Sequence, residues 1–117
     1  MSYDRIGVIG AMDSELAALI AALAQPARET VQGLVFHTGR LGAREVVLVR
    51  CGIGKVSAAR CTQVLIDRFA PDAVINTGIA GGLASGLAVG DIVVADGLVQ
   101  HDFDACLLYT SDAADEL

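Results

Sequence analysis

Residues 5–10, RIGVIG, form a short apolar run that Gly10 closes, which is typical of a buried strand with a tight exit. Directly after it, apolar residues recur at intervals of three and four, and Pro26 then interrupts the pattern. This spacing predicts an amphipathic helix over residues 13–24. A buried strand that leads at once into a helix indicates an α/β fold.

The rest of the chain continues this alternation. The runs LVFHTGR (34–40) and REVVLVRC (44–51) predict a hairpin, and GIGK (52–55) opens a helix that ends before Pro71. Two further apolar runs, AVINTG (73–78) and DIVVADGLV (91–99), predict strands. Because the strands are apolar throughout, we expect a three-layer α/β domain, in which flanking helices cover both faces of a mostly parallel central sheet.

Length and composition narrow the possible functions. The 117 residues allow one domain, and 54% of them are hydrophobic, which excludes a disordered chain. Asp4 stands where a signal peptide would carry basic residues, and no apolar run is long enough to span a bilayer, so we expect a cytoplasmic protein without a membrane partner. A net charge of −6 without a basic cluster argues against nucleic acid. Three widely spaced cysteines predict neither disulfides nor a zinc site.

Three loops at strand ends are candidate ligand sites, because α/β sheets bind ligands beyond the carboxyl ends of their strands. They cover residues 10–15, 51–55 and 76–82. In the first loop, Glu15 falls in the first turn of the predicted helix. A carboxylate at this place is suited to act as a general base, but it is also typical of a helix cap, and the spacing alone favours the cap.

The two glycine-rich loops lack a nucleotide-binding signature. Residues 49–56 miss the first glycine and the final Ser/Thr of a Walker A loop, and Ser57 replaces the third glycine of the dinucleotide fingerprint. Lys55 is interpreted as a solvated residue of the helix start. The segment TGIAGGL (77–83) offers backbone N–H groups to a ribose, a phosphate or a base edge, or serves only as a sharp turn.

Two further groups of polar residues are weak candidates for a site. His101, Asp102 and Asp104 are metal-type ligands within four residues, but alternation along an extended chain would separate them, so a solvated loop is favoured. His37 lies within a strand pattern without a nearby partner in the sequence and is interpreted as structural.

Four segments together resemble one enzyme family. IGVIGAMDSE, CGIGKVSAA, DAVINTGIAGGL and VGDIVVADGLVQHDFDA, in this order, are similar to the N-terminal half of the 5′-methylthioadenosine/S-adenosylhomocysteine nucleosidases. The resemblance covers residues 4 to about 105. It implies a nucleoside phosphorylase-like fold, no cofactor and no metal. It also implies hydrolysis of the N-glycosidic bond of 5′-thio-substituted adenosines with release of adenine, a step of methionine salvage.

The resemblance also implies roles for individual residues. Glu15 matches the glutamate that activates the attacking water, and Met12 matches a residue beside the ribose. Ile53 matches a position near the ribose and the 5′-substituent, and Ile79, Ala80 and Gly81 match a loop against the sugar and the base. Some members carry a serine in place of Ile79, so a hydroxyl contact to the water is missing here.

What lies beyond these matches limits the expected activity. The family's acid for the leaving adenine and its glutamate for the ribose hydroxyls fall in the later half, so we expect residues 1–105 alone to form an incomplete site. Residues 106–117 do not resemble the family and look like an adapter-derived, non-native tail. The parent enzyme is expected to be a homodimer.

Three alternatives to this function remain open. They are a futalosine hydrolase, a purine nucleoside phosphorylase of the same superfamily, and a non-catalytic ligand-binding α/β module in which Glu15 only caps a helix.

Overall fold

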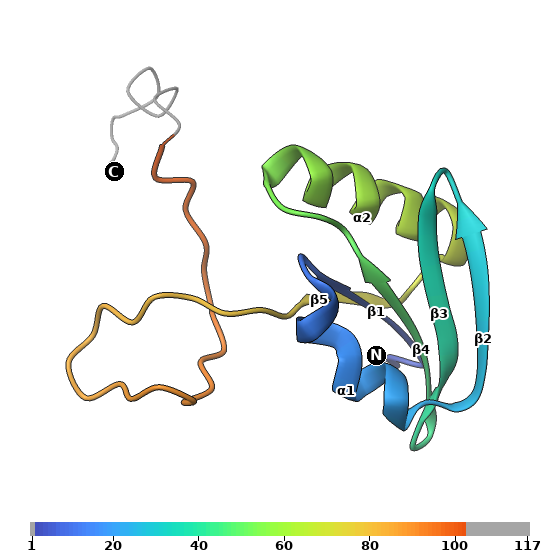
Figure 1. The fold of residues 1–117 in the computed structure, drawn as a ribbon, viewed down its shortest axis with the longest axis horizontal. Coiled ribbons are helices and arrows are strands. Elements are labelled where there is room, and N and C mark those ends of the chain that lie inside the picture. Colours follow the sequence, from blue (N-terminus) through green and yellow to red (C-terminus); the bar gives the residue numbers. More distant parts are fainter. Residues whose placement is uncertain (1, 103–117) are drawn as a thin grey trace. The chain divides into compact units, whose positions relative to one another are not determined.

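The computed structural model describes residues 2–102, which fall into two units that divide between Gly81 and Gly82. All helices and strands of the described chain lie in the first unit (Figure 1). In chain order they are β1 (Arg5–Gly10), α1 (Asp13–Ala22), β2 (Ala24–Val31), β3 (Leu34–Leu41), β4 (Arg44–Arg50), α2 (Lys55–Phe69) and β5 (Ala73–Asn76).

The five strands form one sheet in the order β2-β3-β4-β1-β5. β1 pairs in parallel with both β4 and β5, whereas β3 pairs antiparallel with β2 and β4. The predicted hairpin of β3 and β4 is confirmed, with Gly42 at a φ of +61° in its two-residue loop. The expected α/β class is therefore confirmed, and the described sheet is mixed because the β2–β3–β4 meander adds antiparallel pairs to the parallel ones.

Helices cover both faces of the sheet, as the apolar strands predict. On one face, Leu16 of α1 packs with Val8, Val46 and Leu48. On the other face, α2 contributes Cys61, Leu65 and Phe69 to a larger cluster with β1, β3 and β4. Successive side chains of a strand point to opposite faces, so neighbours such as Val8 and Ile9 of β1, or Val46 and Val47 of β4, belong to different halves of the core.

The larger cluster contains a buried aromatic pair and a buried thiol. Phe36 is fully buried, and the centroid of its ring lies 4.9 Å from the centroid of the Phe69 ring. Burial raises the pKa of the Cys61 thiol to about 11, with the nearby Cys51 adding to the shift and Arg60 opposing it. Both described cysteines are buried free thiols, which agrees with their interpretation as core residues.

Strand β2 corrects the predicted helix boundary. The helix was expected to continue to Ala24, but α1 ends at Ala22, and Ala24 already begins β2. Pro26 therefore lies in a strand. It is tolerated there because β2 is the sheet edge and its pairing with β3 shifts between Ala24 and Ala27. The largely exposed, polar sequence AQPARETV carries no alternating apolar pattern that would have predicted it.

The predicted strand over residues 91–99 is wrong for the described chain. Residues 82–102 contain turns, with Gly86 and Gly90 at positive φ, and no strand. A strand needs a neighbour for its backbone N–H and C=O groups, and no described residue pairs with this segment. Its apolar side chains, such as Ile92 and Val94, are largely exposed. Among residues 2–102, no helix has the length and apolar character needed to cross a bilayer.

Candidate active site

The loops that follow β1, β4 and β5 leave the sheet side by side. Gly10 pairs with Arg50, and Ile9 pairs with Asn76, so the carboxyl ends of the three parallel strands reach the same edge. The amide of Cys51 donates to the Gly10 carbonyl at 2.8 Å, and that of Thr77 donates to the Ile9 carbonyl at 2.9 Å. The three candidate loops predicted from the sequence are therefore neighbours. We name the edge of the sheet that they form, residues 10–15, 51–55 and 76–82, the catalytic edge.

Glu15 joins two of these loops through its carboxylate. Its Oε1 accepts a hydrogen bond from the Met12 amide at 3.0 Å, and its Oε2 accepts one from the Ile79 amide at 3.2 Å. The Glu15 amide in turn donates to the Met12 carbonyl at 3.1 Å. Glu15 thus caps α1, as the spacing favoured, and also reaches across to the loop after β5.

This arrangement leaves the carboxylate able to take a proton. Each carboxylate oxygen carries two lone pairs, and the two backbone amides use only one on each oxygen. Glu15 is half-buried, so a water molecule or a hydroxyl can approach the remaining lone pairs. Capping and general-base chemistry are therefore compatible in the same side chain.

Gly78 packs directly against this carboxylate. A Cβ at position 78 would lie 2.7 Å from Oε2 of Glu15, closer than real Cβ atoms approach another atom. The absence of a side chain is therefore what allows the Ile79 amide to reach the carboxylate. The sequence did not indicate this role, although Gly78 belongs both to the strand run AVINTG and to the glycine-rich segment TGIAGGL.

Three apolar residues lie in the loops that form the catalytic edge. Met12 precedes α1, Ile79 follows β5, and Ile53 lies between two glycines with positive φ at the start of α2. Ile53 and Ile79 are 79% and 84% exposed, which is unusual for large apolar residues in a short loop. Loops that carry both a carboxylate and exposed apolar side chains are suited to a ligand with polar and apolar parts.

The remaining predicted residues occupy less informative positions. Ala80 and Gly81 continue the loop after Ile79 and are exposed, and Lys55 is the exposed first residue of α2. His37 lies on β3 opposite Arg28 of β2. Residues 2–102 contain no group of three His, Cys, Asp or Glu residues placed to hold a metal ion. His101 and Asp102 lie in the second unit, whereas Asp104 and the proposed tail 106–117 fall outside the described residues.

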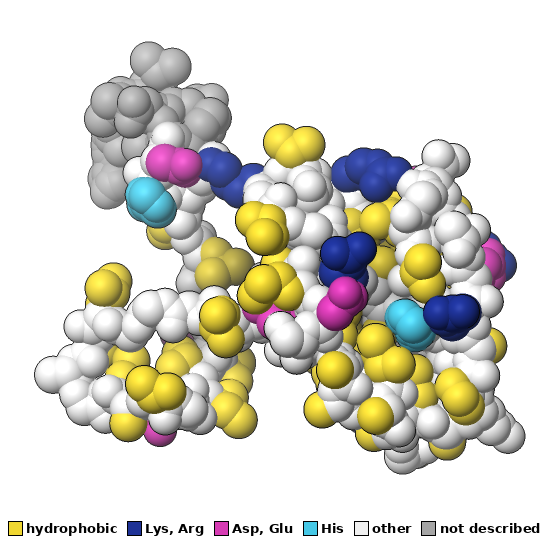
Figure 2. Space-filling model, in the orientation of Figure 1, with side chains coloured by type: hydrophobic (Ala, Val, Ile, Leu, Met, Phe, Trp, Pro, Cys, Tyr) yellow, Lys and Arg dark blue, Asp and Glu magenta, His cyan; other side chains and the backbone are white. Residues whose placement is uncertain are grey.

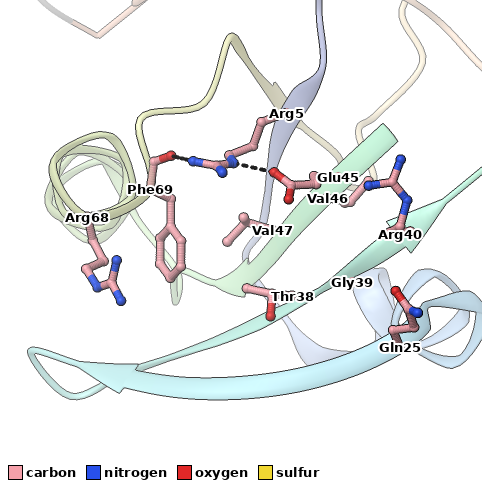
Figure 3. Close-up of a pocket in the computed structure, with 10 residues that line it drawn as sticks. All are labelled: Arg5, Gln25, Thr38, Gly39, Arg40, Glu45, Val46, Val47, Arg68 and Phe69. Carbon is pink, nitrogen blue, oxygen red and sulfur yellow. Dashed lines mark hydrogen bonds and ion pairs between the residues drawn. The ribbon is translucent and has the colours of Figure 1, made fainter. Parts of the chain in front are cut away.

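A hollow lies at the opposite edge of the sheet, near the start of β1 and the end of α2 (Figure 3). Its volume is about 350 Å³, and its side chains include three arginines. Arg5 is held between the Glu45 carboxylate and the Phe69 carbonyl, and Arg68 forms two hydrogen bonds with Glu29. Glu45, the carboxylate among the residues that line this hollow, is paired with Arg5, so the catalytic edge remains the better candidate for chemistry.

Comparison with known proteins identifies the family. Residues 5–113 match the model of the phosphorylase superfamily. The chain belongs to the phosphorylase superfamily.

The most similar sequences that we compared come from one group of enzymes within this superfamily. Over 100 residues, which are 86% of this chain, it is 48% identical to the 5′-methylthioadenosine/S-adenosylhomocysteine nucleosidase of Shewanella pealeana and 50% identical to that of Shewanella putrefaciens. The matched region spans 44% and 43% of these relatives, so the chain covers less than half of their length.

A solved structure shows the same similarity in three dimensions. The S-adenosylhomocysteine nucleosidase of Streptococcus pyogenes, in complex with 5-methylthiotubericidin, superposes with a TM-score of 0.88 at 45% identity. The superposition covers 94% of this chain and 47% of that one. The superfamily fold expected from the sequence motifs is therefore confirmed.

Proposed function

We propose that this chain supplies the water-activating part of a nucleosidase active site, which hydrolyses 5′-methylthioadenosine and S-adenosylhomocysteine. The observation that carries the proposal is the Glu15 carboxylate, which two backbone amides hold at the catalytic edge with acceptor capacity left for water. The relatives, at about half identity, bear the name of this activity.

The reaction breaks the bond between C1′ of the ribose and the adenine nitrogen, and forms a new bond between C1′ and the water oxygen. The transition state resembles an oxocarbenium ion, so the water must lose a proton as it attacks. Glu15 accepts that proton on a free lone pair. The departing adenine must gain a proton, and the family resemblance assigns that acid to a part of the enzyme beyond the matched region.

The apolar residues of the catalytic edge would hold the substrate. In this proposal Met12 lies beside the ribose, Ile53 contacts the ribose and the 5′-substituent, and the Ile79–Gly81 segment lies against the sugar and the base. Ile79 cannot offer the side-chain hydroxyl that some family members have at this position. Its backbone amide, however, donates to Glu15 and so fixes the general base without a hydroxyl.

The same proposal extends to the cellular setting. Release of adenine from a 5′-thio-substituted adenosine would place the enzyme in methionine salvage, in the cytoplasm and as a homodimer. These finer points are supported by the family resemblance. The length of the matched relatives supports a further part of the enzyme that supplies the acid and the contacts to the ribose hydroxyls.

Adenine release tests the catalytic role of Glu15. We define the hybrid nucleosidase as residues 1–102 of this chain followed by the corresponding remainder of the Shewanella pealeana relative. It should release adenine from 5′-methylthioadenosine at a rate independent of phosphate, whereas a phosphorylase would require phosphate. Glu15→Gln should lower kcat by at least about a hundredfold, because the amide cannot accept the water proton.

Controls separate this chemistry from the helix cap. In Glu15→Gln the side-chain amide oxygen can still accept from the Met12 amide, so α1 keeps its cap and substrate binding should persist. Glu29→Gln removes an equivalent charge on β2 and should leave kcat unchanged. Near-native turnover by the Glu15→Gln protein would leave Glu15 as a cap only and favour the non-catalytic alternative.

A further inference from the structure

The three strands that lead to the catalytic edge are tied to one another where they begin. Asp72 directly precedes β5, and its Oδ2 accepts hydrogen bonds from the Asp4 amide at 2.9 Å and the Arg5 amide at 2.8 Å. The Asp4 carbonyl in turn accepts from the amide of Glu45 in β4 at 3.0 Å. We name these four residues the starting edge.

Strand β5 depends on hydrogen bonds for its alignment with β1. It covers four residues and lies at an edge of the described sheet. Hydrophobic side chains reach the surface of the molecule in several places (Figure 2), and in β5 they include Val74 and Ile75, which are 37% and 52% exposed. Packing specifies the register of a strand weakly where its side chains are not buried on one face. The two hydrogen bonds to the Asp72 carboxylate therefore contribute directly to the register.

The alignment of β5 determines where the Ile79 amide lies. At the far end of the two strands, Ile9 pairs with Asn76, and the Thr77 amide donates to the Ile9 carbonyl at 2.9 Å. Ile79 follows two residues later. A strand that slips must move by two residues to keep its faces, which is roughly 6.6 Å at about 3.3 Å per residue. Such a slip would carry the Ile79 amide away from Oε2 of Glu15, which it meets at 3.2 Å.

We propose that Asp72 is a positioning residue for the general base, an inference that rests on the proposed nucleosidase function. Asp72 holds the start of β5 in register with β1, and so keeps the Ile79 amide at the Glu15 carboxylate at the other end of the strands. It contacts neither the substrate nor the reacting atoms, and acts through the backbone of β5. The carboxylate at the starting edge thus supports the carboxylate at the catalytic edge.

Substitutions at Asp72 separate the role of its oxygen from that of its charge. Both amides donate to the same oxygen, so Asp72→Asn can keep an acceptor there without the charge, whereas Asp72→Ala removes it. In the hybrid nucleosidase, Asp72→Ala should lower kcat about tenfold, and Asp72→Asn should restore it to within about threefold of native. In the 117-residue chain, the Ile79 amide resonance should lose its hydrogen-bonded character in Asp72→Ala and keep it in Asp72→Asn.

A double substitution tests whether Asp72 acts through the contact of Ile79 with Glu15. Gly78→Ala disturbs that contact directly, because its Cβ would lie 2.7 Å from Oε2. Once the contact is lost, removal of the Asp72 carboxylate has nothing further to disturb there. The double variant should therefore have a kcat within about threefold of that of Gly78→Ala alone. Losses in kcat that multiply would show that Asp72 acts by another route and would overturn the inference.

Asp67→Ala is the matched control. Asp67 is an exposed carboxylate of α2 that accepts from Gln63 on the same helix, so its loss should change neither kcat nor the Ile79 amide. If Asp72→Ala does not fold, Asp72→Glu, which displaces the carboxylate by one methylene, takes its place with the same expectations.

The outcomes distinguish this inference from the proposed function. A native kcat, or an unchanged Ile79 amide, in the folded Asp72→Ala protein would overturn the positioning role while the proposed function stands. Failure of the unsubstituted hybrid nucleosidase to release adenine would instead refute the proposed function, and the inference with it.

Discussion

Gly78→Ala tests whether the position of the Glu15 carboxylate sets the rate of the proposed reaction. The new Cβ would lie 2.7 Å from Oε2, so the carboxylate must retreat by about 0.7 Å to reach the 3.4 Å at which ordinary van der Waals contact begins. That shift stretches the 3.2 Å contact with the Ile79 amide beyond hydrogen-bonding distance. The φ of Gly78 lies outside the left-handed region, so alanine adds no backbone strain.

The expected result is a loss of rate with little loss of stability. Misplacement of a reacting group by about 1 Å lowers the rate roughly a hundredfold. We therefore expect kcat of the hybrid nucleosidase to fall by a factor of about 10 to 100. The lost hydrogen bond costs about 1 kcal/mol of unfolding free energy, and the reduced chain entropy of alanine offsets most of it. Adenine release and thermal unfolding measure the two quantities separately.

A control and a direct structural observable accompany this prediction. At Gly82 a Cβ would make only ordinary contacts, 3.5 Å from Leu87, so Gly82→Ala should keep the native rate. In the 117-residue chain, the Ile79 amide resonance should lose its hydrogen-bonded character in Gly78→Ala only. An unchanged kcat together with an unchanged Ile79 amide would refute the reasoning.

Two further predictions concern the core. Phe36→Ala should lower the free energy of unfolding by about 3–5 kcal/mol in denaturant titration, because it empties a fully buried site beside Phe69. As a control, Val35→Ala on the exposed side of β3 should lower it by less than about 1 kcal/mol. A small loss for Phe36→Ala would show that the core collapses around the gap. The raised pKa of Cys61 predicts that its thiol stays neutral in the folded chain and resists alkylation at pH 9. It also predicts that the free energy of unfolding falls between about pH 9 and 11, because in this range the unfolded thiol has lost its proton while the folded one keeps it. Peptide-level mass spectrometry after iodoacetamide treatment measures the alkylation, and Cys61→Ala should flatten the pH dependence; rapid labelling of Cys61 in the folded chain would contradict the prediction.

The catalytic edge could be predicted from the sequence because it depends on a general property of parallel strands. The runs that end at Gly10, Cys51 and Gly78 are short and apolar, and parallel strands bring their carboxyl ends to one edge. The sequence therefore indicated which loops meet, and the structure confirms that they do. It also left open whether Glu15 caps a helix or serves as a base, and the geometry allows both in one side chain.

Features that depend on pairing could not be predicted in the same way. Strand β2 is polar and mostly exposed, and it forms because β3 offers it an edge, which no local pattern in AQPARETV indicates. Conversely, residues 91–99 have strand composition but pair with no described residue. The contact of Ile79 with Glu15 spans 64 positions in the sequence and requires the register of β1 with β5.

A hollow on the α1 face of the sheet shows the same limitation. The side chains that line it include Asp13 of α1, Arg28 of β2, His37 of β3 and Arg50 of β4, and none of them belongs to a short motif. The antiparallel register sets Arg28 against His37, and the parallel register sets Arg50 against Gly10, from which the chain continues to Asp13. These pairings place the four residues around one cavity.

Mapping where 5′-methylthioadenosine binds on the 117-residue chain tests the central claim most directly. Amide chemical shifts followed during an NMR titration should change in the loops after β1, β4 and β5, with the largest changes at Met12, Ile53 and Ile79. Such a pattern would place the nucleoside beside the Glu15 carboxylate. Changes confined to the opposite edge, around Arg5 and Phe69, or no saturable change at all, would contradict the assignment of the catalytic edge as a nucleoside site.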